Sequence, residues 1–207
     1  MVHDMLQAFA QYKVLTAILI AAVALLVFVL VKASRAVRRH NAERDAILAR
    51  LQKEKALREK YTSFTREIAL SSDGKELLHG VALCIQKTIE KEPDLTAAFT
   101  ALPAEKQIVY ALDFVLCEDA ETISAFFRLN GKPLTTAALE GARRTFDAEH
   151  LELFETGYRM FDPDDETTSC VPGDVQKLDA DFAAADETAL YEGIRNFIAD
   201  NAELFSK

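Results

Sequence analysis

Two pairs of metal-binding residue types share the same spacing in this sequence. Glu76 and His79 form one pair, and Asp147 and His150 form the other. A carboxylate and an imidazole three residues apart lie on one face of a helix, which is the arrangement that binds iron in di-iron four-helix bundles. Such a centre also needs carboxylates from two further helices that point into the core.

The apolar residues around the first pair argue against a metal centre there. Leu78, Val81 and Ile85 form the hydrophobic stripe of the helix that would contain it. His79 is turned about 100° from Leu78 around the helix axis, and Glu76 lies further round. We therefore interpret Glu76 and His79 as solvent-exposed residues, and we predict no metal site.

The sequence also lacks the motifs of other kinds of catalytic site. The three cysteines, Cys84, Cys117 and Cys170, have no histidine at helical spacing and no Cys-x-x-Cys arrangement. The sequence contains no glycine-rich phosphate loop, nucleophile elbow or zinc-ligand spacing. We interpret the acidic residues between 113 and 121 as exposed helix faces. The sequence therefore predicts a protein that is not an enzyme and has no cofactor.

The elements that position these residues are all predicted to be helices. Residues 35–68 contain no Gly or Pro and are rich in good helix formers. Asp73 followed by Glu76 predicts a helix start, and no segment alternates polar and apolar residues with period two. The fold class is therefore all-α. Further helices are predicted at about 73–91, 94–99, 105–117, 119–129, 135–146, 148–160, 175–184 and 187–204.

The longest apolar stretch, residues 14–31, predicts a transmembrane helix. It holds 18 residues without a charge, about 27 Å of helix. A cleaved signal peptide is disfavoured because the positive charges follow the run, and a buried core helix because the run has no amphipathic stripe. Four membrane-flanking basic residues follow it: Lys32, Arg35, Arg38 and Arg39.

These charges predict the orientation of the anchor. Because basic flanks stay in the cytosol, residues 1–13 should be extracytoplasmic and the C-terminal domain cytosolic, with the bacterial inner membrane as the expected location. Widely spaced cysteines fit a reducing cytosol. The prediction is thus a single-pass membrane protein in contact with the lipid bilayer.

Charge divides the remainder of the chain in two. Residues 1–60 carry a net charge of +6 and residues 61–207 a net charge of −15. We predict a basic juxtamembrane helix over 32–70, which could form a short coiled coil, and an acidic all-helical domain over 71–207. A homodimer could form through either the anchor or the juxtamembrane helix. The acidic domain disfavours direct nucleic-acid binding and favours a basic protein partner. The proposed partner-binding residues are Asp162, Asp164, Asp165 and Glu166.

Part of the acidic domain is similar to a known family. The matching stretches are 102–110, 118–131, 138–142, 178–182 and 190–205. In them the chain resembles the DNA-mimic protein C-terminal-like family. The resemblance implies an all-α fold and an acidic surface of the kind with which a member is thought to occupy a DNA-binding protein. The family's Gly-Gly turn is absent, since residues 118–126 read EDAETISAF here.

Three functional hypotheses are consistent with these sequence features. The leading hypothesis is an anchored, non-catalytic domain that presents its acidic surface to a basic protein at the cytosolic membrane face. The second is a membrane-tethered enzyme that depends on carboxylates or a metal. The third is a membrane assembly factor that acts through its anchor.

Overall fold

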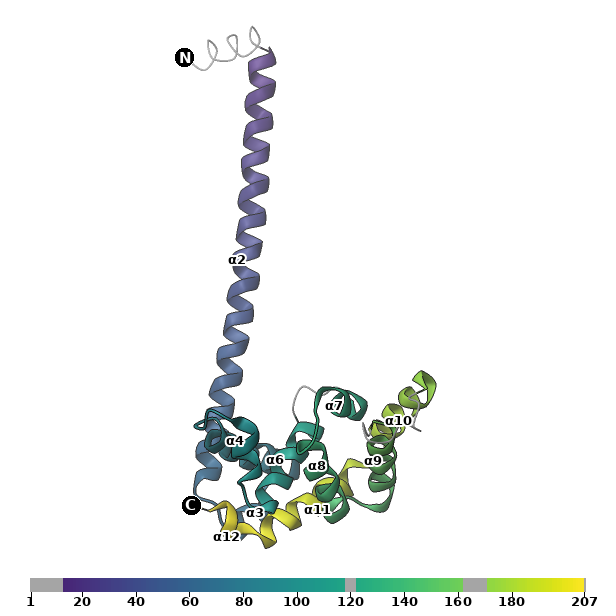
Figure 1. Cartoon of the computed structure of the whole chain (residues 1–207). Helices are drawn as coiled ribbons and strands as arrows, with labels where there is room; N and C mark the ends of the chain where they lie inside the picture. Colours follow the sequence, from purple (N-terminus) through teal and green to yellow (C-terminus); the bar gives the residue numbers. More distant parts are fainter. Residues whose placement is uncertain (1–12, 118–121, 162–170, 207) are drawn as a thin grey trace. The chain divides into compact units, whose positions relative to one another are not determined.

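The protein is all-helical, as the sequence predicts. Its structure, a computed structural model, describes residues 13–117, 122–161 and 171–206, and no β-strand occurs in them (Figure 1). The chain forms two compact units that divide after residue 53. Helix α2 (Lys13–Thr62) supplies the regular structure of the first unit and the beginning of the second.

The predicted transmembrane helix is not supported. Residues 14–31 are the start of α2, which continues through the charged residues to Thr62. The side chains described in this stretch fall in the short runs 17–23 and 25–29. Within the described residues, no helix has both the length and the apolar character that a bilayer crossing requires. This finding overturns the predicted anchor and the single-pass membrane localisation inferred from it.

Ten helices follow α2 in the described residues of the second unit. They are α3 (Arg66–Ser71), α4 (Gly74–Ile89), α5 (Leu95–Thr100), α6 (Ala104–Leu116), α7 (Ile123–Leu129), α8 (Leu134–Thr145), α9 (Ala148–Met160), α10 (Pro172–Ala184), α11 (Glu187–Asp200) and α12 (Ala202–Phe205).

Side-chain caps set several of these helix starts. The carboxylate of Asp73 accepts the N–H of Glu76 at 2.9 Å, which confirms the start predicted for α4. Thr122 caps α7 in the same way. By contrast, α8 begins at Leu134, one residue before its predicted start, and α10 begins at Pro172, three residues before its predicted start. A proline suits that first position because its missing N–H would have no partner there.

The core lies where α6 packs between α4 and α8, with α11 across α3, α4 and α8 (Figure 1). Ile108, Leu112 and Ile194 are at most 1% exposed. At Gly193, an added Cβ would lie 1.9 Å from the carbonyl oxygen of Thr145, so only glycine permits this approach of α11 to α8. A second group of buried rings joins α7 and α9, where Phe127 and Phe154 lie 5.0 Å apart between centroids.

Candidate functional site

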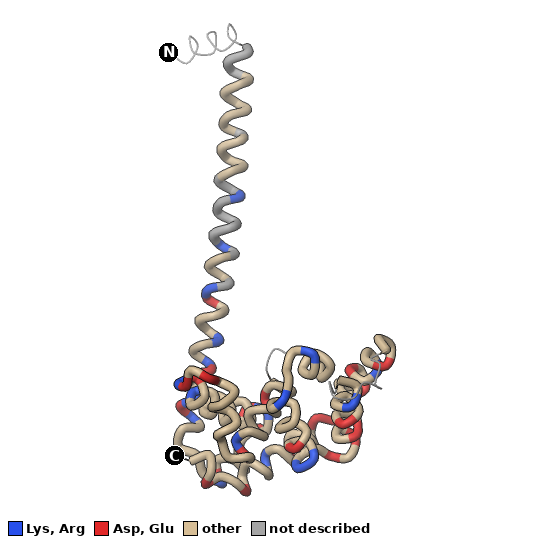
Figure 2. Tube along the Cα trace, viewed as in Figure 1, with Lys and Arg blue, Asp and Glu red and all other residues tan. Residues whose placement is uncertain are grey.

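Acidic side chains gather on the last third of the chain. Residues 147–192 hold 14 Asp and Glu against two Lys and Arg. Ten of the 14 lie in the described parts of this range, where acidic positions outnumber basic ones along α9 and α10 (Figure 2). We define the acidic surface as four carboxylates that α9 and α10 expose: Glu149, Glu152, Asp174 and Asp181.

Asp147 and His150 secure the start of α9. One carboxylate oxygen of Asp147 accepts the N–H groups of Glu149 and His150 at 3.0 and 3.1 Å, and the other lies 2.6 Å from Nδ1 of His150. Burial raises the pKa of Asp147, but the hydrogen bonds from His150 outweigh it and hold the pKa below its ordinary value. His150 is 1% exposed, with Phe146 and Phe182 against its ring. Glu149 therefore faces solvent from an anchored first turn.

Helix α10 is held to α7 by a carboxylate. Asp179 accepts the N–H of Ser124 at 3.0 Å and its hydroxyl at 2.6 Å. Val175 and Leu178 are buried on the same helix. Because these contacts orient α10, its remaining carboxylates point outward.

Few neighbouring cations neutralise this end of the domain. Glu155 pairs with Arg143 at 2.8 Å, and Glu192 pairs with Arg195 at 3.6 Å. None of the four carboxylates of the acidic surface forms an ion pair with another described residue. Nearby, the N–H and hydroxyl of Thr188 lower the pKa of Asp186, the N-cap of α11. The region therefore presents negative potential at neutral pH.

The structure describes only some of the site residues that were proposed from the sequence. Asp162, Asp164, Asp165 and Glu166 lie outside the described residues. Lys32 and Arg38 are exposed on α2, and Nζ of Lys32 lies 5.3 Å from the ring centroid of Phe28. The side chains of Arg35 and Arg39 fall outside the described part of α2. The membrane-flanking role of these four basic residues depended on the transmembrane helix, which is not supported.

Glu76 and His79, the first carboxylate-histidine pair, both contact other helices. Glu76 accepts from Tyr61 at 3.1 Å and pairs with Lys60, whose ammonium group lowers the pKa of Glu76. His79 lies 3.1 Å from the carboxylate of Asp113, and its side chain is only 22% exposed. The exposed placement predicted for His79 is therefore wrong.

Asp113 is the residue that sequence reasoning missed. It was assigned to an exposed acidic cluster, but it is 3% exposed. The signal was present, since Val109, Leu112 and Leu116 lie one helical turn or one residue away on the apolar face of α6.

Tyr191 of α11 is a further polar residue near Asp113. Burial raises the pKa of Tyr191, and the negative charges of Cys117 and nearby carboxylates add to this effect. Nζ of Lys75 lies 5.8 Å from the ring centroid of Tyr191. Across the described residues, no group of three or more His, Cys, Asp or Glu side chains is arranged to hold a metal ion. These groups pack α4, α6 and α11 together.

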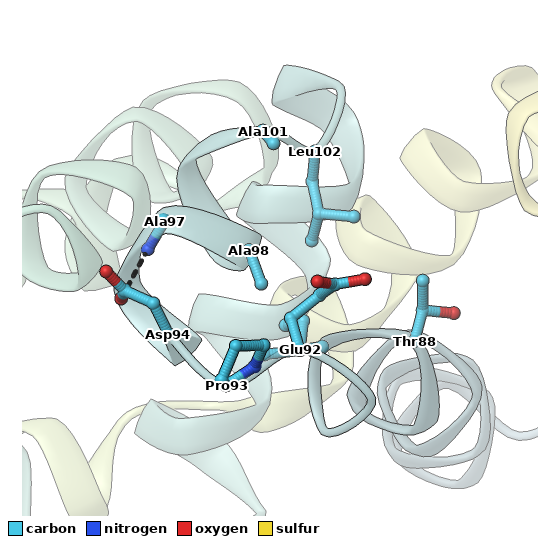
Figure 3. Close-up of a pocket in the computed structure, with 9 residues that line it drawn as sticks. Thr88, Glu92, Pro93, Asp94, Ala97, Ala98, Ala101 and Leu102 are labelled. Carbon is cyan, nitrogen blue, oxygen red and sulfur yellow. Dashed lines mark hydrogen bonds between the residues drawn. The ribbon is translucent and has the colours of Figure 1, made fainter.

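A hollow of about 440 Å³ opens at the end of α4 and along α5 (Figure 3). Its walls are mostly apolar, including Pro93, Ala98 and Leu102. Of its two carboxylates, Asp94 is the N-cap of α5 and accepts the N–H of Ala97 at 3.0 Å. This hollow contains no cysteine, histidine or lysine among its described lining residues.

Comparison with known proteins finds no relative: the chain matches no family model, no curated protein and no solved structure. The resemblance to the DNA-mimic family stays a prediction.

Proposed function

We propose that the second unit is a non-catalytic interaction module whose acidic surface binds a basic protein. The supporting observation is the set of four exposed carboxylates on α9 and α10 that form no ion pair with another described residue. Such a surface attracts a basic partner over long range and raises the rate of encounter, with a strong dependence on salt.

The way these helices are held supports binding rather than catalysis. Asp147 and Asp179 use their carboxylates to cap α9 and to join α10 to α7, so they are occupied by structural bonds. The outward carboxylates remain for a partner. A preorganised charged surface loses little conformational entropy on binding, because its backbone is already ordered.

The test compares two variants of the full chain with the same change in net charge. The first carries Glu149→Gln, Glu152→Gln, Asp174→Asn and Asp181→Asn. The control carries four Glu→Gln changes at exposed positions elsewhere: Glu67, Glu90, Glu92 and Glu203. Proteins recovered by pull-down at low and high salt are identified by mass spectrometry.

We expect the first variant to lose the salt-sensitive basic proteins that the unaltered chain recovers, and the control to keep them. Equal loss from both variants would mean that net charge, rather than this surface, attracts the partner. A third variant that neutralises Asp162, Asp164, Asp165 and Glu166 tests whether these four residues also contribute to binding.

A further inference from the structure

Basic side chains meet in a groove on this acidic domain. Lys55 and Arg58 lie on the last turns of α2, and Lys87 and Lys91 lie on the last turn of α4 and just beyond it. These four residues line one hollow of about 400 Å³, which we call the basic groove. Glu59 is its only carboxylate among the described lining residues, so the groove carries a net charge of +3.

Most of these cations lack a carboxylate partner. Lys55 lies 3.9 Å from Glu59, and both side chains are largely exposed. Arg58, Lys87 and Lys91 take part in none of the ion pairs between described residues. Elsewhere in the domain, five cations contact a carboxylate: Lys60, Arg66, Arg143, Arg144 and Arg195. Other described cations, such as Lys106 and Lys177, also form no ion pair with a described residue, so the groove differs from them in bringing several such cations together.

Like charges that share a groove repel one another, because the protein surface screens them less than bulk water does. The unit that contains the groove, residues 54–207, has 30 acidic and 16 basic residues, so carboxylates to neutralise these cations were available in the sequence. The unpaired cations therefore favour an anion from outside the chain.

The floor of the basic groove adds apolar and hydroxyl groups. Tyr61 and Phe205 are both largely buried, at 1% and 9% exposure, and they line the groove with Thr88 and Cys84. The Cys84 thiol donates to the carbonyl oxygen of Arg58 at 3.6 Å, which places it beside the α2 cations. The hollow in Figure 3 shares Thr88 but has two carboxylates and no cation in its described lining, so the two hollows select opposite charges.

We propose that the basic groove is a binding site for a small soluble anion that carries phosphate groups. Its volume lies within the range of about 300–1,000 Å³ that is usual for ligand pockets. Lysine ammonium groups bind phosphate as point charges, and an arginine adds paired N–H donors. A net charge of +3 matches a diphosphate better than a single carboxylate, which would leave most of the charge uncompensated.

The test titrates inorganic pyrophosphate into the full chain by isothermal calorimetry. We expect saturable binding that weakens between 50 and 200 mM NaCl, because added salt screens the attraction between the exposed cations and pyrophosphate. The variant Lys87→Gln/Lys91→Gln should bind at least about tenfold more weakly. The matched control Lys106→Gln/Lys177→Gln removes two lysines outside the groove and should bind as the unaltered chain does. Circular dichroism checks that both variants fold.

Absence of saturable binding by the unaltered chain would overturn the proposal, and so would an equal loss in the control.

A second measurement needs no variant. At ten times the dissociation constant, pyrophosphate should slow the alkylation of Cys84 by N-ethylmaleimide about tenfold. Cys117 has similar, intermediate exposure but lies outside the groove, so its rate should not change. Mass spectrometry of the labelled peptides separates the two thiols. Equal rates for Cys84 with and without pyrophosphate would contradict the proposed site.

Discussion

The two carboxylate-x-x-histidine pairs have the same spacing but different structures. In α9, Asp147 and His150 bond to each other, with 2.6 Å between carboxylate and imidazole. In α4, Glu76 and His79 turn to different neighbours: Glu76 contacts α2, and His79 contacts Asp113 of α6. The spacing is therefore not enough to say what the pair does.

The difference follows from where each pair lies in its helix. Asp147 is the N-cap, so its carboxylate folds back over the first turn and meets the residue three positions on. Glu76 occupies that third position in α4, because the cap is Asp73. Its longer side chain extends away from the turn to the ammonium group of Lys60.

The largest expected effect is at His150. We expect His150→Ala to lower the free energy of unfolding by about 3 kcal/mol, since it opens a cavity among buried rings and removes the bond to Asp147. Urea denaturation measures this change. His150→Leu, which fills the space without replacing the bond, should recover more than half of the loss. If it recovers nothing, the hydrogen bond rather than packing holds this region.

A smaller effect is expected at His79. We expect His79→Ala to cost about 2 kcal/mol, because it leaves the buried carboxylate of Asp113 without the imidazole. In an Asp113→Asn background the same change should cost under about 1 kcal/mol, since no buried charge is left. Equal costs in both backgrounds would show that the two residues do not stabilise each other.

The smallest expected effects are the contributions of Asp147 and Glu76 to stability in acid. The folded-state pKa values of Asp147 and Glu76 lie below their ordinary values of 3.8 and 4.5, by hydrogen bonds from His150 and by Lys60 respectively. Unfolding therefore takes up protons, so their stabilisation is complete above those ordinary values and is lost as the pH falls through the lowered ones.

We expect the stability lost on acidification from pH 5 to pH 3 to be smaller in Asp147→Asn and in Glu76→Gln, by about 1 kcal/mol or less each. Added 0.5 M NaCl should remove the Glu76 contribution, because that pair is exposed, and leave that of Asp147, which is bonded to the backbone. Thermal unfolding across the pH series measures both. Equal salt sensitivity of the two contributions would contradict this difference between Glu76 and Asp147.

Sequence reasoning was strongest where local chemistry decides. The start of α4 at Asp73 and the end of α7 at Leu129 can be predicted because caps and turns act within a few residues. It was weakest at residues 14–31, where an apolar run alone suggested a bilayer crossing that the described residues do not support.

The sites followed the same division. The acidic excess of residues 147–192 can be predicted from composition alone, because charge is a property of the residues themselves. The basic groove is not, since Lys55 and Arg58 lie about 30 residues from Lys87 and Lys91 and are joined only by the packing of α2 on α4. The partners of Glu76 and His79 escaped prediction for the same reason.

For the paired carboxylates and histidines, the sequence alone determined the spacing, the helices and the cap at Asp147, all of which depend on bonds within one turn. Only the tertiary structure decided that His79 meets Asp113 and that His150 is buried by Phe182. Those contacts join residues more than 30 positions apart, and their energies depend on which helix faces pack together and how much water they exclude.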